Sequence, residues 1–138
     1  DSNEAFSAPQ TRSPASTPAP VYNRLQYPDM QARSLGKITV PAPGTPVRLT
    51  ADPALTCARI RIQDVIGQTG RLFLGVAGMD KSTGAGLIKE FWPTGGGGGI
   101  ADEITLDSPD GTNALRLADY YIDANIAGEG VIVSYWVR

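Results

Sequence analysis

From Leu35 onward, short stretches of alternating apolar and polar residues follow one another, separated by glycine, proline and other turn-forming residues. Alternation with a period of two indicates a β-strand that buries one face, and many such strands at close spacing are typical of an antiparallel sandwich or barrel. The 16 glycines and 11 prolines of the chain favour turns over a long helix. We predict strands near residues 35–40, 45–51, 56–63, 71–77, 87–92, 102–106, 119–124 and 130–137. Segment 112–118 is open to a helical turn instead.

Eight short strands predict an all-β domain over residues 35–138, a jelly roll or a related antiparallel β-sandwich. Side-chain parity then assigns the faces of each strand. The positions predicted to face the core include Ala58, Ile60, Ile62, Leu72, Leu74 and Val76. The last strand is apolar on both parities, so we expect it to be central in its sheet or covered. Phe73 and Trp136 lie on the opposite parity to the core, which favours a contact surface with another chain.

Residues 1–34 have a different composition, with five prolines among small polar residues and no sustained apolar period. Such a segment cannot build a core of its own, and its three acidic and three basic residues balance. We predict an extended, proline-rich N-terminal arm. Its candidate partner-binding residues are Phe6, Tyr22, Leu25, Tyr27 and Met30. The run Gly95 to Gly99 predicts a mobile loop within the domain.

The charge balance and hydropathy of the chain argue against nucleic acid and membranes as partners. Lys and Arg total 12 against 14 Asp and Glu, so no broad basic surface is available for nucleic acid. No stretch approaches the roughly 18 apolar residues that a membrane span needs, and we expect no membrane partner. The sequence begins at Asp1 rather than methionine. We expect that upstream residues were cleaved, lost or left out.

The residues that most enzymes use are scarce in this chain. It has no histidine, which removes the usual general base and the commonest zinc ligand. Cys57 is the only cysteine, and without a histidine partner we interpret it as a small filler residue. The stretch from Gly75 to Ser82 superficially resembles a phosphate-binding loop, but Asp80 stands where that motif has glycine. We therefore predict a protein that is not an enzyme, with no cofactor and no catalytic residue.

The acidic residues of the C-terminal half and the aromatic residues are two further candidate binding groups. The acidic residues of the C-terminal half lack the spacing of a calcium loop, and we predict no metal site. They are Asp102, Glu103, Asp107, Asp110, Asp119, Asp123 and Glu129. The aromatic residues favour core packing over a sugar-stacking platform. They are Phe91, Trp92, Tyr120, Tyr121, Tyr135 and Trp136.

Four segments between residues 43 and 135 resemble the capsid-decoration, or cement, proteins of tailed bacteriophages. They are Pro43-Gly44-Thr45-Pro46-Val47-Arg48-Leu49-Thr50, Thr69-Gly70-Arg71-Leu72-Phe73-Leu74-Gly75, Met79-Asp80-Lys81-Ser82-Thr83-Gly84, and Asp119-Tyr120-Tyr121-Ile122-Asp123 with Gly128-Glu129-Gly130-Val131. These are strand and turn patterns without a chemical role, and the resemblance does not cover the arm.

The resemblance implies a β-sandwich or jelly-roll subunit outside an icosahedral shell that ties neighbouring major capsid subunits together. Its partner would be the major capsid protein, and its location the outer capsid surface after synthesis in the host cytoplasm. We also expect a homo-oligomer, with a dimer favoured over a trimer. The alternative reading is a carbohydrate-binding or adhesin-like β-sandwich module of a head fibre or tail.

Overall fold

The computed structural model describes residues 30–93 and 101–138. The contacts of the chain divide it into Asp1–Met30 and Gln31–Arg138, and every strand within the described residues belongs to the second unit. The strands are β1 (Gln31–Thr39), β2 (Val47–Arg48), β3 (Thr56–Cys57), β4 (Arg59–Asp64), β5 (Leu72–Asp80), β6 (Ala85–Phe91), β7 (Glu103–Asp107), β8 (Leu115–Arg116), β9 (Tyr120–Ala124) and β10 (Gly130–Val137). The 3₁₀ helix η2 (Leu117–Asp119) overlaps only the end of segment 112–118, which was open to a helical turn.

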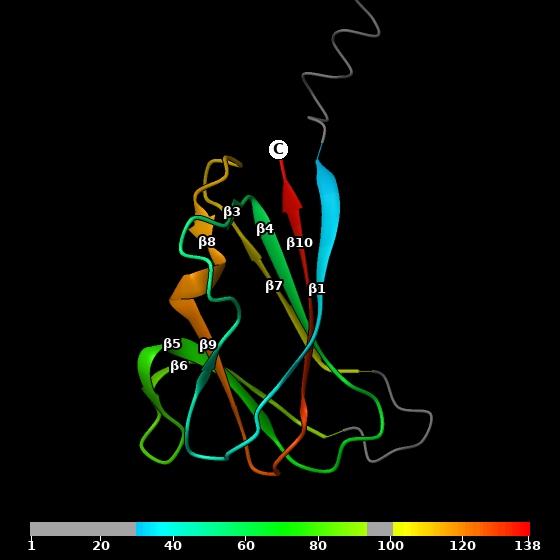
Figure 1. The fold of residues 1–138 in the computed structure, drawn as a ribbon, viewed down its shortest axis with the longest axis vertical. Helices are drawn as coiled ribbons and strands as arrows, with labels where there is room; N and C mark the ends of the chain where they lie inside the picture. Colours follow the sequence, from blue (N-terminus) through cyan, green and yellow to red (C-terminus); the bar gives the residue numbers. More distant parts are fainter. Residues whose placement is uncertain (1–29, 94–100) are drawn as a thin grey trace, which may run out of the picture. The chain divides into compact units, whose positions relative to one another are not determined.

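The strands form two four-stranded antiparallel sheets and one short pair, so the all-β prediction is confirmed (Figure 1). The first sheet has the order β1-β10-β4-β7, the second has the order β2-β9-β5-β6, and β3 pairs with β8. Setting the short pair aside, the first strand pairs with the last, the second with the seventh, the third with the sixth and the fourth with the fifth. This nested pairing is that of a jelly roll, a long hairpin rolled into two sheets.

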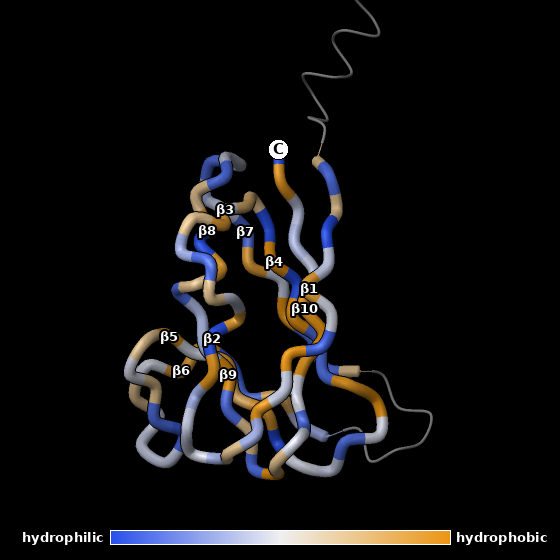
Figure 2. The backbone as a smooth tube through the Cα atoms, viewed as in Figure 1, coloured by the Kyte–Doolittle hydropathy of each residue, from blue (hydrophilic) through white to orange (hydrophobic). Residues whose placement is uncertain are grey.

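One hydrophobic core lies between the two large sheets. Ile60 and Ile62 of the first sheet and Leu72 and Leu74 of the second belong to the same buried cluster and are fully buried. Apolar and polar positions alternate along β4 (Figure 2), as expected for a strand with one face in the core. β10 lies between β1 and β4, so it is central in its sheet, which was one of the two expectations for its apolar pattern.

One face assignment from the sequence is wrong, and one residue expected to be exposed is covered. Val76 was predicted to face the core, but it is 40% exposed because the pairing of β5 with β6 is irregular after Gly75. Phe73 lies on the outer parity as predicted, yet it is only 6% exposed. Its strand neighbours are Glu90 and Asp123, and the Nζ atom of Lys81 lies 5.7 Å from its ring centroid. The Phe73 ring is therefore covered by its own chain and is not an exposed contact residue.

Candidate functional site

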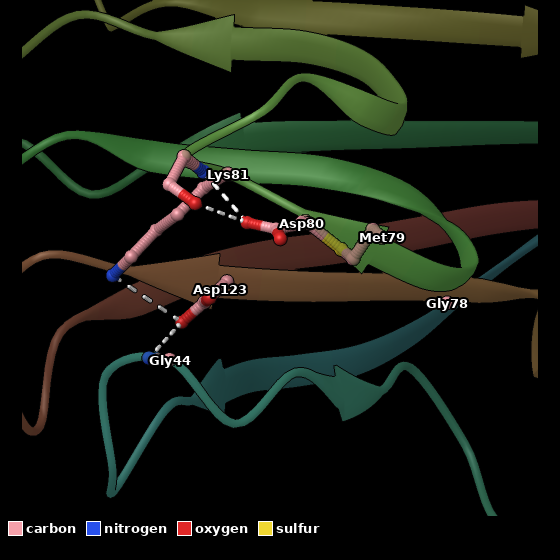
Figure 3. A pocket seen from close by; sticks show the side chains of 7 residues that line it. Gly44, Gly78, Met79, Asp80, Lys81 and Asp123 are labelled. Carbon is pink, nitrogen blue, oxygen red and sulfur yellow. Dashed lines mark hydrogen bonds and ion pairs between the residues drawn. The ribbon is translucent and has the colours of Figure 1, made fainter.

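A pocket of about 360 Å³ opens where the turn between β5 and β6 meets the loop before β2 (Figure 3). Its lining residues are Gly44, Gly78, Met79, Asp80, Lys81, Ser82 and Asp123. The end of β5 and the turn after it carry five of the seven, because the bulge in β5 brings Gly78 and Met79 out of the regular ladder. Asp123 comes from β9, on the outer face of the second sheet beside Phe73.

Asp123 is the most deeply buried charged group of this pocket, at 2% exposure. Its Oδ1 atom accepts hydrogen bonds from the backbone N–H groups of Gly44 (3.0 Å) and Ala124 (2.7 Å). The Nζ atom of Lys81 lies 3.8 Å from the same oxygen and donates to the Ala124 carbonyl at 2.6 Å. A buried carboxylate is tolerated when such donors surround it. Asp123 thus ties the loop at Gly44 and the β5–β6 turn to β9.

The second carboxylate of the pocket, Asp80, serves the turn itself. Its Oδ1 atom accepts from the backbone N–H (2.9 Å) and the hydroxyl (2.6 Å) of Ser82. These hydrogen bonds, led by that of the Ser82 hydroxyl, lower the pKa of Asp80 from its ordinary value. The stretch from Gly75 to Ser82 is therefore a strand and a polar turn. The lysine and both carboxylates of this pocket make bonds that hold the fold together, which favours a structural role.

The outer face of the first sheet presents a different arrangement, with apolar side chains of β10 beside charged pairs that join β4 and β7. Trp136, in register with Arg59 and Ala32, is half-buried, and Ile132 is 37% exposed. On the β7 side, Arg59 pairs with Asp107 and Arg61 with Glu103, each at 2.6 Å. We call Ile132, Trp136 and these two ion pairs the β10 face.

A third feature is the exposed indole of Trp92 at the end of β6, which is 57% exposed. The guanidinium carbon of Arg71 lies 3.7 Å from the ring centroid, and Arg71 donates to Glu90 at 2.7 Å. The backbone N–H of Trp92 donates to Asp102, which also pairs with Lys89. The neighbouring Phe91 is fully buried, so of these two adjacent aromatic residues one packs in the core and the other lies on the surface.

The remaining candidates from the sequence have structural roles or lie outside the described residues. Each of the seven acidic residues of the C-terminal half has a hydrogen-bond or ion-pair partner. Cys57 is fully buried in the core cluster, and this burial raises the pKa of its thiol to about 11, so the thiol stays neutral. Phe6, Tyr22, Leu25 and Tyr27 and the run Gly95 to Gly99 lie outside the described residues. Met30 is the first of the described residues and is half-buried.

Sequence reasoning missed the Lys81–Asp123 contact. The two residues are far apart in the chain, and only the pairing of β5 with β9 brings them together. The one available signal was a carboxylate between Ile122 and Ala124 within an apolar strand, which indicates a buried acid or an exposed face without distinguishing them.

Comparisons with protein families, curated proteins and solved structures find no match to this chain. Within residues 30–93 and 101–138, no group of three or more His, Cys, Asp or Glu side chains is placed to hold a metal ion. The same described part of the chain contains no helix with the length and apolar character for a membrane crossing.

Proposed function

We propose that this chain is a non-enzymatic structural protein of a phage virion, which binds the outside of an icosahedral capsid and ties neighbouring major capsid subunits together. The sequence resemblance to decoration proteins supports binding to the outside of a capsid. The jelly roll supports it at the level of fold alone, since this architecture occurs in capsid and lectin domains alike.

The observation that carries the proposal is the β10 face. Protein interfaces combine an apolar, often aromatic centre with a polar rim, and tryptophan and arginine are the residues most often important for affinity. Ile132 and Trp136 supply the apolar centre here, and the Arg59–Asp107 and Arg61–Glu103 pairs supply a rim on one side. Because these charges already pair within the chain, attachment would depend mainly on apolar burial and only weakly on salt.

The test uses two matched isoleucines of the full chain. Ile132 on β10 is 37% exposed and Ile88 on β6 is 40% exposed, so an aspartate at either position faces solvent in the free protein. Wild type, Ile132→Asp and Ile88→Asp are mixed with purified capsid shells stripped of decoration protein, and the bound fraction is measured by sedimentation. We expect Ile132→Asp to bind at least about tenfold more weakly, the effect of losing roughly 1.4 kcal/mol, while Ile88→Asp binds as wild type.

Failure of wild type to sediment with shells would overturn the proposed function. Equal binding of wild type and Ile132→Asp would leave attachment to shells standing but exclude the β10 face as its site. Circular dichroism of each variant confirms that a loss of binding does not come from unfolding.

A further inference from the structure

The surface around Trp92 has the composition of a site for a small polar ligand with one apolar face. Among the other described aromatic side chains, Phe73, Phe91 and Tyr135 are 6%, 0% and 7% exposed, and Tyr120, Tyr121 and Trp136 are half-buried. Trp92 instead leaves 57% of its surface open. An exposed tryptophan side chain contributes little to stability through core packing. The contacts that hold its ring in place therefore bear on whether it binds a ligand.

The ring is held by a chain of charged contacts. Extending the register of Leu72 with Phe91 by one residue places Arg71 opposite Trp92 on the outer face of the second sheet. The Arg71 guanidinium stacks 3.7 Å from the indole centroid and is itself fixed by Glu90 at 2.7 Å. Asp102 accepts a hydrogen bond from the Trp92 backbone N–H at 3.2 Å and pairs with Lys89 at 3.2 Å. The indole is therefore oriented before any ligand arrives.

We infer that Trp92, flanked by Arg71, Glu90 and Asp102, is a binding site for an uncharged pyranose ring of a saccharide. The guanidinium occupies one face of the indole, and the other face can receive the C–H groups of a sugar ring. The carboxylates of Glu90 and Asp102 accept hydrogen bonds from sugar hydroxyls, and the Arg71 guanidinium donates to them. A purely apolar protein contact would leave these three charged groups against apolar surface, which is unfavourable.

This inference does not depend on the shell-binding role. Trp92 lies at the end of the second sheet, whereas the β10 face belongs to the first sheet. Sugar binding can therefore fail while shell binding succeeds, and the reverse.

The test measures saccharide binding by the full chain on a glycan array, followed by titration in solution with the array hits and with methyl glycosides of glucose, galactose and N-acetylglucosamine. Tryptophan fluorescence reports the titration, and Trp136→Phe removes the second indole so that the signal belongs to Trp92. We expect Trp92→Ala to weaken binding by at least about tenfold. Trp92→Phe should lose less because it keeps an aromatic face, and Glu90→Gln should lower affinity while the ring stays in place.

The inference is overturned if no glycan binds and none of the glycosides changes the fluorescence of the Trp136→Phe protein. It is equally overturned if Trp92→Ala binds the array hits as well as wild type. A Trp92→Ala protein that loses attachment to capsid shells, with no glycan bound by wild type, would assign the surface to a protein partner instead. Circular dichroism establishes that each variant is folded.

Discussion

At the scale of single residues, Asp64 is the most unusual group in the domain. It is fully buried, its Oδ1 atom accepts from Val65 and Gln68, and its Oδ2 atom is buried without a hydrogen-bond partner. Burial is the main cause that raises the pKa of Asp64 above its ordinary value of 3.8, and the nearby Glu129 and Asp102 carboxylates add to it. The folded state thus holds this proton more tightly than the unfolded state.

This shift predicts how Asp64 contributes to stability with pH. Because the folded-state pKa is the higher one, its contribution to the free energy of unfolding is greatest below pH 3.8 and falls as pH rises through the folded pKa. Asp64→Asn should remove this decline, so the variant should gain stability relative to wild type as pH rises from 3.5 to 7. Urea unfolding of both proteins across that range measures the difference. A difference that is constant with pH would show that the pKa of Asp64 is the same in the folded and unfolded states.

Gly130, the first residue of β10, predicts a second residue-scale effect. A Cβ atom at this position would overlap the backbone carbonyl of Ile38 on β1, and backbone cannot move aside as a side chain can. We expect Gly130→Ala to lower the free energy of unfolding by about 3 kcal/mol. The control is Gly128→Ala, where the φ of +86° is strained for alanine but no atom lies within 4 Å. That control should cost about 1 kcal/mol, and equal losses would argue against the overlap.

At the scale of elements, strand positions were predictable because half-buried strands reveal themselves by alternation. β1 shows the limit: its expected start was Leu35, but the strand begins at Gln31. Gln31 to Ser34 are exposed and carry no large apolar side chain, so no apolar period marks them, and they are ordered by pairing with the end of β10. Such a segment gets its structure from its neighbour, which sequence reasoning along one stretch cannot detect.

The buried contacts of Asp123, which join β9 to the β5–β6 turn and to the loop before β2, predict a large loss of stability when they are broken. Asp123→Ala would leave the N–H groups of Gly44 and Ala124 without their acceptor and Lys81 without its counter-charge. We expect a loss of about 3 kcal/mol in the free energy of unfolding. Asp107→Ala, which removes a partner from an ion pair with side chains 41% and 56% exposed, should cost below about 1 kcal/mol. Urea denaturation compares the two, and similar losses would contradict a structural role for Asp123.

At the scale of the whole molecule, strand count and turn chemistry predicted a jelly roll or related sandwich, but not which strands pair. Nested pairing joins β1 to β10 across nearly the entire domain, and no local pattern encodes contacts at that separation. The candidate sites likewise divide into residues that a local pattern identified and residues whose environment depends on tertiary pairing. Trp136 was identified from parity within one strand, whereas the covering of Phe73 by Lys81 and the support of Trp92 by Arg71 depend on tertiary pairing.

The position of β1 in this nested pairing predicts where the domain can be shortened. The core cluster and all the strands that the structure describes lie within residues 31–138, so a chain that starts at Met30 keeps every described element. We expect deletion of residues 1–29 to leave the free energy of unfolding within about 0.5 kcal/mol of the full chain. Deletion of residues 1–34 also removes Gln31 to Ser34, which pair with Ser134 to Val137. That longer deletion should cost about 1–2 kcal/mol in lost ladder hydrogen bonds.

The longer deletion has a second consequence that separates the two variants. It leaves the end of β10 as an unpaired strand edge beside Trp136, and exposed edges associate with other chains. The protein lacking residues 1–34 should therefore form oligomers at concentrations where the protein lacking residues 1–29 has the same mass as the full chain. Light scattering coupled to size exclusion measures mass, and urea unfolding measures stability. If both deletions behave alike in the two measurements, the first four residues of β1 do not stabilise the sheet, and Leu35 is the physical start of the domain.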